Sequence, residues 1–155
     1  MAIAFVPIPT EVVRAYQVGG PDAYGLTPER AVSDGDGVPC RHCFQYVRKG
    51  ADYLVLAYRP FPAVQPYAKT GPIFLCAEAC EAAEPGAELP AILSSPHYIL
   101  RGYAANDRIV YGTGRVVALG DLVAAAETLL AQDRIAYAHV RSAANNCFHL
   151  RVERA

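Results

Sequence analysis

Residues 135–153, IAYAHVRSAANNCFHLRVE, decide the fold of this 155-residue chain. Apolar and polar side chains alternate on both sides of the short segment 142–146, and a period of two is typical of β-strands. We therefore predict strands over 135–141 and 147–153. Such a pair joined by a short connection indicates an antiparallel sheet.

The rest of the chain predicts further short elements around this pair. Turn residues bound apolar runs that we interpret as strands over 2–6, 31–33, 53–58, 72–76, 98–104 and 108–111. A short N-terminal helix over 10–17, with Thr10 as N-cap, and a main helix over 121–132 complete the prediction. Helices at two places among hairpin-linked strands indicate an α+β fold with a mostly antiparallel sheet, in a single domain over 1–155.

Composition excludes some classes of function. The formal net charge of −1 argues against a nucleic-acid partner, because such proteins normally carry a basic face. Pro7 and Pro9 interrupt the first apolar run, so we predict neither a signal peptide nor a membrane span, and we expect no membrane partner. We expect a bacterial protein in the cytoplasm, where thiols stay reduced. Oligomeric state cannot be inferred from composition.

Four of the five cysteines form two close pairs, and this spacing is typical of a structural zinc site. The pairs are Cys40 with Cys43, and Cys76 with Cys80. One turn can supply two ligands at such spacing, and four thiolates leave no coordination position open for a substrate. We predict that these four residues bind one structural zinc ion.

Two alternatives to the zinc site stay open at this stage. A redox pair would need Cys40 at a helix N-terminus, but residues 44–49 have a weak helical pattern and no βαβ surroundings. Small buried cysteines can also fall in pairs by coincidence. His42, inside the first pair, can replace a ligand, although its position favours a role beside the site.

Alternation also predicts a polar sheet face. Tyr137, His139 and Arg141 share one side of their strand, and Arg101 and Tyr103 share one side of the 98–104 strand. On the last strand we assign Phe148, Leu150 and Val152 to the apolar side, and Cys147, His149 and Arg151 to the polar side. A face rich in arginine suits a small anionic ligand, with Arg101, Tyr103, His139, Arg141 and Arg151 as candidate binding residues.

Other interpretations of the same face remain. One face of an antiparallel sheet is commonly solvated, and polar residues then alternate without forming a site. A thiol beside an imidazole can be a nucleophile, so an enzyme with Cys147 as nucleophile and His139 as base is an alternative. A zinc-stabilised interaction module without a small ligand is a third. Whether the protein is an enzyme therefore stays open.

Several stretches together resemble an uncharacterised bacterial family, Domain of Unknown Function family 1203. The resemblance covers most of the chain in the expected order, and its stretches are residues 39–41, 66–67, 70–74, 100–103, 136–141, 147–148 and 151–155. It implies no activity, because the family has none established. It also implies that the paired cysteines are a structural option within the family. Residues 142–146 depart from the pattern, since relatives place a glycine before Cys147.

Overall fold

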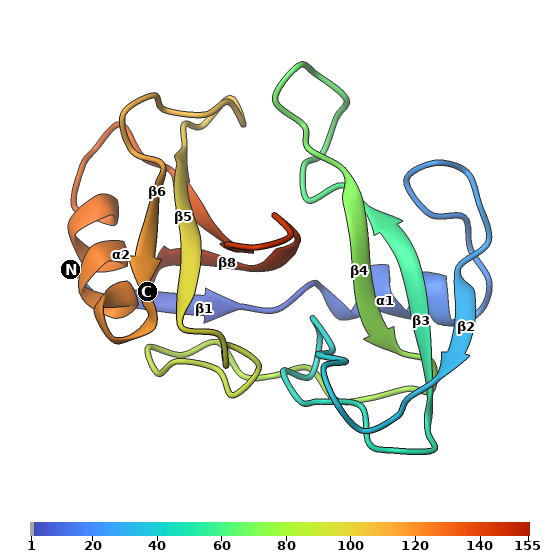
Figure 1. The fold of residues 1–155 in the computed structure, drawn as a ribbon. Helices are drawn as coiled ribbons and strands as arrows, with labels where there is room; N and C mark the ends of the chain where they lie inside the picture. Colours follow the sequence, from blue (N-terminus) through green and yellow to red (C-terminus); the bar gives the residue numbers. More distant parts are fainter. Residues whose placement is uncertain (1) are drawn as a thin grey trace.

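The computed structural model describes residues 2–155 and contains two antiparallel sheets (Figure 1). The larger sheet has five strands in the order β1-β8-β7-β5-β6. Their bounds are β1 (Ile3–Val6), β5 (His97–Tyr103), β6 (Arg115–Ala118), β7 (Tyr137–Ser142) and β8 (Phe148–Arg154). The smaller sheet has the order β2-β3-β4, with β2 (Glu29–Val32), β3 (Asp52–Tyr58) and β4 (Gly71–Cys76). The predicted α+β class, with largely antiparallel strands, is confirmed.

The N-terminal segment connects the two sheets. β1 is an edge strand of the larger sheet, and the chain then crosses to α1 (Thr10–Gln17), which lies beside the smaller sheet (Figure 1). At the crossing, the Ile8 amide donates to the Arg41 carbonyl at 3.1 Å. Val13 of α1 is fully buried in an apolar cluster with Leu54 and Leu75 of the smaller sheet. Packing of the apolar side of α1 against the smaller sheet therefore stabilises this short helix.

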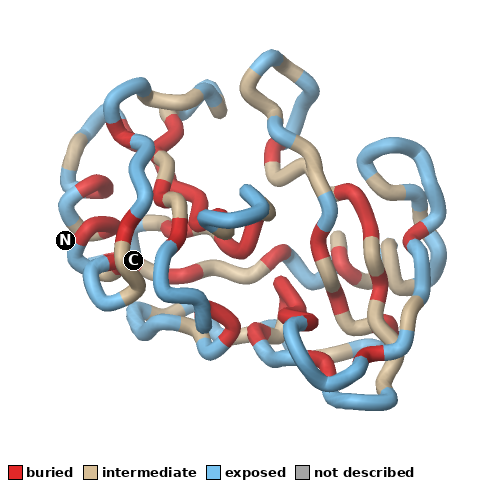
Figure 2. Tube along the Cα trace, viewed as in Figure 1, coloured by how far each residue is buried: buried red, intermediate tan, exposed pale blue. Residues whose placement is uncertain are grey.

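The second helix covers one face of the larger sheet. α2 (Leu122–Leu130) follows a short 3₁₀ turn, η1 (Leu119–Asp121), and packs on the apolar side chains of β5, β7 and β8. Gly102 permits this close approach, since a Cβ there would lie 3.0 Å from Ile135 Cδ1 and 3.3 Å from Leu129 Cδ1. Figure 2 shows the buried residues concentrated in the strands and on the sheet side of α2. This face of the sheet is therefore one side of the main core.

Most of the predicted elements are present with small shifts in their bounds. The α1 bounds agree with the prediction, but Thr10 is its first residue and the cap position belongs to Pro9. The predicted strand over 108–111 is wrong, because only Ile109 bridges to Tyr103 there. The chain instead turns through Gly112 and pairs with β5 later, as β6, an element that we did not predict.

A β-bulge changes the faces of β8. Val140 pairs with Leu150, but the next pair is Arg141 with Phe148, so His149 is an extra residue on β8. Phe148 therefore lies on the same face as Arg141, and its assignment to the apolar side is wrong. The strict alternation that we assumed therefore places Phe148 on the wrong side.

No helix in residues 2–155 is long and apolar enough to cross a membrane.

Candidate metal centre and arginine–histidine face

The four paired cysteines meet in space at one end of the smaller sheet. Their Sγ atoms all lie within 4.8 Å of one another, and Cys40–Cys80 and Cys43–Cys76 are each 3.9 Å apart. Zinc–sulfur bonds of about 2.3 Å place tetrahedral sulfur atoms about 3.8 Å apart. No disulfide joins any of these cysteines. The cluster can therefore hold a metal ion.

Hydrogen bonds to sulfur orient the ligands. The Cys76 amide donates to Cys40 Sγ at 3.3 Å, and His42 Nδ1 lies 3.1 Å from Cys80 Sγ. The other ring nitrogen of His42 lies 2.9 Å from the Thr10 hydroxyl, which begins α1. His42 is thus a contact of the thiolate rather than a fifth donor, and such contacts fix the orientation of metal ligands.

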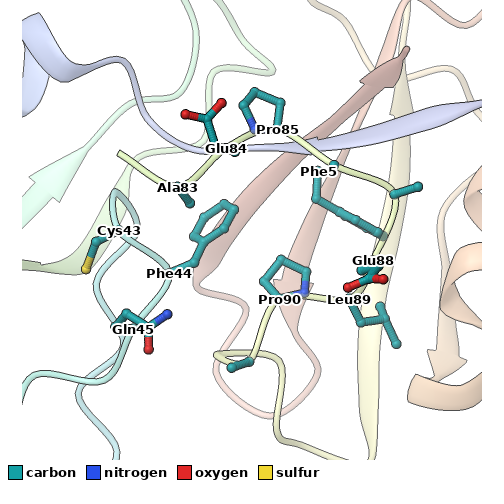
Figure 3. Close-up of a pocket in the computed structure, with 13 residues that line it drawn as sticks. Phe5, Cys43, Phe44, Gln45, Ala83, Glu84, Pro85, Glu88, Leu89 and Pro90 are labelled. Carbon is teal, nitrogen blue, oxygen red and sulfur yellow. The ribbon is translucent and has the colours of Figure 1, made fainter. Parts of the chain in front are cut away.

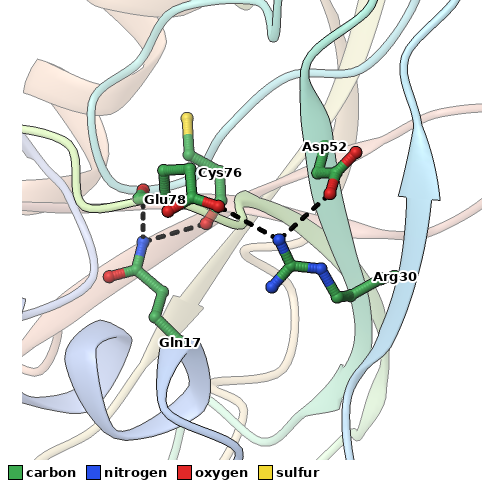
Figure 4. A network of polar contacts seen from close by, with 5 residues as sticks. All are labelled: Gln17, Arg30, Asp52, Cys76 and Glu78. Carbon is green, nitrogen blue, oxygen red and sulfur yellow. Dashed lines mark hydrogen bonds and ion pairs between the residues drawn. The ribbon is translucent and has the colours of Figure 1, made fainter.

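Helix α1 also holds the second cysteine pair in place. Arg14 Nη2 donates to the Cys80 carbonyl at 2.6 Å, and Gln17 Nε2 donates to the Cys76 and Glu78 carbonyls at 2.9 Å each. Figure 4 shows Gln17 beneath this turn, and Arg30 bonded to both Asp52 and Glu78 beside it. Helix α1 therefore supports the second cysteine pair through three side-chain hydrogen bonds to its carbonyls.

The close sulfur atoms shift one another's protonation. Hydrogen bonds from Cys43, Cys76 and Cys80 lower the pKa of Cys40, and the hydrogen bond to Cys40 is the main cause that raises the pKa of Cys76. Thiols at this distance cannot all ionise unless a cation compensates their charge. The donor set therefore fits a soft divalent metal such as zinc.

A cavity of about 480 Å³ lies beside the metal cluster (Figure 3). It is lined by Phe5, Cys43, Phe44 and the connection over 83–91. The Cys43 sulfur in Figure 3 is directed away from this cavity. The Cys43 sulfur therefore does not face this cavity.

The predicted ligand residues share one face of the larger sheet. Arg101 pairs with His139, His139 pairs with Arg151, and Tyr103 pairs with Tyr137. Arg141, two residues from His139 on β7, lies on the same side. We call Arg101, His139, Arg141 and Arg151 the arginine–histidine face. His97 is exposed at the start of β5 and does not belong to it.

This face is buried against the smaller sheet and its connections. His139 is 0% exposed and Arg141 is 4% exposed. Four aromatic rings surround the His139 imidazole, with centroid distances between 4.8 and 5.2 Å: Phe61, Tyr103, Tyr137 and Phe148. The alternative of a solvated face is therefore wrong for His139 and Arg141.

Several polar atoms on this face have no hydrogen-bond partner within residues 2–155. They are Arg101 Nη1, Tyr103 Oη, Arg141 Nη1 and both ring nitrogens of His139. Arg141 uses its other nitrogens to bond the Asn146 side chain and carbonyl, at 2.8 and 2.7 Å. Buried guanidinium groups normally have a carboxylate or another anion as partner. Unpartnered donors on two arginines are therefore an exception that needs a chemical explanation.

The local charge keeps His139 neutral. Burial holds the pKa of His139 well below its usual value, and the positive charges of Arg141, Arg151 and Arg101 lower it further. Burial also lowers the pKa of Arg141. A neutral imidazole offers one donor and one acceptor. The face therefore combines fixed positive charge with one adaptable hydrogen-bonding ring.

A cavity of about 510 Å³ opens beside His139 and Arg151. Its other walls are mainly apolar or aromatic, and include Val12, Tyr16, Tyr58, Phe61 and Phe148. The Arg151 guanidinium stacks 3.8 Å from the Tyr137 ring centroid. The arrangement suits an apolar body with a polar end directed toward the sheet.

Cys147 and His139 do not form a hydrogen-bonded pair. Neither ring nitrogen of His139 has a partner, while Cys147 Sγ lies 3.8 Å from the Asn145 carbonyl. Cys147 instead lines a separate cavity with Arg41 and His149. We did not predict Phe61 or Arg41 as residues of a ligand site. Both lie outside the alternating strands, and no local pattern indicates where their side chains pack.

The chain matches a family model, described as a protein of unknown function (DUF1203), over residues 37–154. That region contains all four paired cysteines and the complete arginine–histidine face. No curated protein and no solved structure matches the chain. Since the match extends over most of the sequence in the order that the resemblance implied, the chain belongs to the DUF1203 family.

Proposed function

We propose that this protein binds a small anionic molecule at the arginine–histidine face, and that a zinc ion in the four-cysteine cluster stabilises the fold. The observation that carries the ligand proposal is the pair of buried, unpartnered nitrogens Arg101 Nη1 and Arg141 Nη1 beside His139. A carboxylate or phosphate oxygen would satisfy both donors and offset the repulsion between the two guanidinium groups.

The surroundings of these donors support the same conclusion. The only ion pair of Arg151 in the described chain is with Glu153, its neighbour on β8, and neither Arg101 nor Arg141 has an ion pair among residues 2–155. Positive charge on the face is therefore only partly compensated by the protein. A buried charge without a partner is costly, so a bound anion would add to folding stability.

The adjacent cavity indicates the kind of anion. Aromatic and aliphatic side chains cover most of the wall beside His139, so a ligand with an apolar or planar body would bury it there. Its anionic group would then lie toward Arg101 and Arg141, with His139 donating or accepting one hydrogen bond. We therefore favour a small carboxylate or phosphate ester over an inorganic ion alone.

The zinc proposal rests on the donor set. Four thiolates with separations near those of a tetrahedral site match zinc better than the oxygen-preferring cations. With all four positions taken by protein sulfur, the ion would hold loops together and would not bind substrate. The metal and the ligand face thus have separate roles.

The alternative of an enzyme with Cys147 and His139 receives less support. The two side chains lack a mutual hydrogen bond, and no described group orients His139 as a base. Reaction chemistry would therefore require a rearrangement of β7 and β8. If no small anion stabilises the protein in the thermal-shift screen, the alternative of a zinc-stabilised interaction module is favoured.

A thermal-shift screen of small carboxylates and phosphates tests the ligand proposal. At ten times Kd, a ligand should add about 1.4 kcal/mol of stability, or ~3–6 °C in Tm for a chain of this size. Arg101→Ala should abolish the shift. Arg115→Ala, an exposed arginine on the neighbouring strand β6, is the matched control and should retain it. Equal shifts in both variants would leave the arginine–histidine face without a ligand.

A further inference from the structure

A second cavity, of about 280 Å³, lies where the first cysteine pair meets the β7–β8 connection. Its wall includes Arg41, Tyr46, Cys147 and His149, and it shares no lining residue with the cavity beside His139. Arg41 lies between two cysteine ligands of the metal cluster in sequence. The metal-binding loop thus presents an arginine to a cavity that is separate from the arginine–histidine face.

The Arg41 side chain is buried and fixed. It is 3% exposed, its Nε donates to the Phe148 carbonyl at 3.0 Å, and its Nη1 donates to the Pro39 carbonyl at 2.8 Å. The guanidinium carbon lies 5.7 Å from the Phe74 ring centroid. These two hydrogen bonds to carbonyl oxygens orient the planar guanidinium but do not neutralise its charge. Its remaining nitrogen, Nη2, makes no hydrogen bond within the described chain.

No aspartate or glutamate lines this cavity. The Arg41 guanidinium is positively charged at neutral pH. A buried positive charge in a cavity without a carboxylate lacks an ionic partner. The cavity therefore favours an incoming negative charge over a neutral ligand.

His149 supplies a second unpartnered polar group. It is 8% exposed, and its Nδ1 has no hydrogen-bond partner among the described residues. The ring stands edge-on to Tyr98, with the centroids 5.5 Å apart. Burial, together with the charges of Arg41 and Arg141, lowers the pKa of His149 to about 3, so the ring is neutral and can donate one hydrogen bond. The β-bulge that made His149 an extra residue thereby adds a donor to the Arg41 cavity.

We propose that this cavity is a binding site for a small carboxylate, held by Arg41 and His149, with the Cys147 thiol on its wall. The guanidinium offers its free edge to the carboxylate oxygens, and the imidazole donates the additional hydrogen bond. The small cavity volume limits the ligand to a few carbon atoms. Cys147 is half-buried, so a bound molecule would lie near a thiol that solvent can reach.

Alkylation of Cys147 tests this proposal. Iodoacetate and iodoacetamide react alike: the thiolate sulfur attacks the methylene carbon, a sulfur–carbon bond forms and iodide leaves. Only the first reagent carries a carboxylate. The rates at Cys147 in the intact zinc-loaded protein are measured by peptide mass spectrometry, and their ratio cancels any general effect on thiol reactivity.

The parent protein should give an iodoacetate-to-iodoacetamide ratio at least tenfold above that of the Arg41→Gln variant. Acetate should slow the iodoacetate reaction in the parent. Arg115→Ala, remote from this cavity, should leave the ratio unchanged. If Arg41→Gln does not fold, His149→Gln replaces it and should lower the ratio severalfold.

Equal ratios in the parent and in the folded cavity variants, with no effect of acetate, would overturn the proposal. This outcome would not affect the proposal for the arginine–histidine face, because the thermal-shift experiment there involves no cysteine chemistry. Conversely, if no anion raises Tm in an Arg101-dependent way, the iodoacetate-to-iodoacetamide ratio at Cys147 still tests the Arg41 cavity. The two sites can therefore fail separately.

Discussion

Arg101 and His139 are cross-strand partners in the middle of the larger sheet, and neither uses the other as a hydrogen-bond partner. The Arg101 Nη1 and both nitrogens of His139 are buried without any partner among residues 2–155. In an antiparallel pair such side chains are neighbours on one face. Their arrangement is therefore suited to a third group that bonds to both of them.

The proposed zinc site predicts different effects for two cysteine substitutions. Cys43→Ser removes one of four ligands and should lower Tm by ~10 °C or more, because metal binding contributes directly to folding free energy. Cys147→Ser, outside the cluster, should change Tm by less than ~2 °C. Differential scanning calorimetry with elemental analysis checks both, and the parent should contain about one zinc per chain. Equal Tm changes, or a parent protein without metal, would contradict this division.

Two of the three buried histidines, His139 and His149, predict a loss of stability in mild acid. The unfolded chain has histidine pKa values of about 6.5, whereas the folded value is about 3 for His149 and well below the usual range for His139. Below pH 6.5 the unfolded state therefore binds more protons, and the free energy of unfolding falls as pH falls. His149 should cost about 2 kcal/mol between pH 7 and pH 5, and protonation of His139 should act in the same direction.

Urea unfolding at pH 7 and pH 5 measures this dependence. His149→Gln should remove the contribution of His149 to this pH dependence while keeping a hydrogen-bonding side chain. His97→Gln changes an exposed histidine at the start of β5 and is the control. A variant at position 149 with the same pH dependence as the parent would show that His149 is not buried in its neutral form.

The close packing at Gly102 predicts a sensitive position. Gly102→Ala should destabilise the fold by about 1–3 kcal/mol, because a Cβ would crowd Ile135, Leu129 and Thr113 Oγ1. Gly71→Ala is the control within a strand, since a Cβ there meets nothing within 4 Å, and its effect should stay within about 0.5 kcal/mol. The free energy of unfolding from urea titration compares the two. A neutral Gly102→Ala would mean that α2 can move away from the sheet at little cost.

The hydrogen bonds of Arg154, near the C-terminus, are expected to contribute to the free energy of unfolding. Its guanidinium donates to the Leu130, Gln132 and Ile135 carbonyls, at 2.8, 2.9 and 2.6 Å, and so completes the end of α2. Arg154→Ala should cost about 1–2 kcal/mol by leaving these carbonyls to solvent. Arg134→Ala removes an exposed arginine that bonds only the Gln132 side chain, and it should be nearly neutral. Chemical denaturation measures both, and similar values would assign no special role to Arg154.

Much of the fold follows from local patterns. The strands over 53–58 and 72–76 and the helix over 10–17 are present with bounds that differ by at most one residue. These segments have one dominant period and clear turn residues on both sides. β6 escaped prediction because its four residues, RVVA, merge into the start of the following helix. Its strand character depends on pairing with β5.

The candidate sites were only partly predictable, because some of their features depend on contacts between distant parts of the sequence. Cysteine spacing predicted the four-cysteine cluster, because each short turn places two cysteines close together. The burial of His139 depends on Phe61, Tyr58 and the smaller sheet, which approach it from distant parts of the sequence. The bulge at His149, opposite Val140 and Arg141, has no signature in the alternation, so the environment of His149 emerges only when β7 and β8 pair.

The position of Phe61 over His139 bears on the exchange kinetics of any ligand. The two rings are 5.2 Å apart, and Phe61 is only 5% exposed, so the residue covers the imidazole from the side of the cavity. An anion bonded to Arg101 and Arg141 would leave only when this covering segment moves. Its residence time would then follow the opening rate of residues 60–62 more than the strength of its ionic contacts. A tightly held ligand could in that case persist through purification, and native mass spectrometry of the untreated protein would reveal its mass.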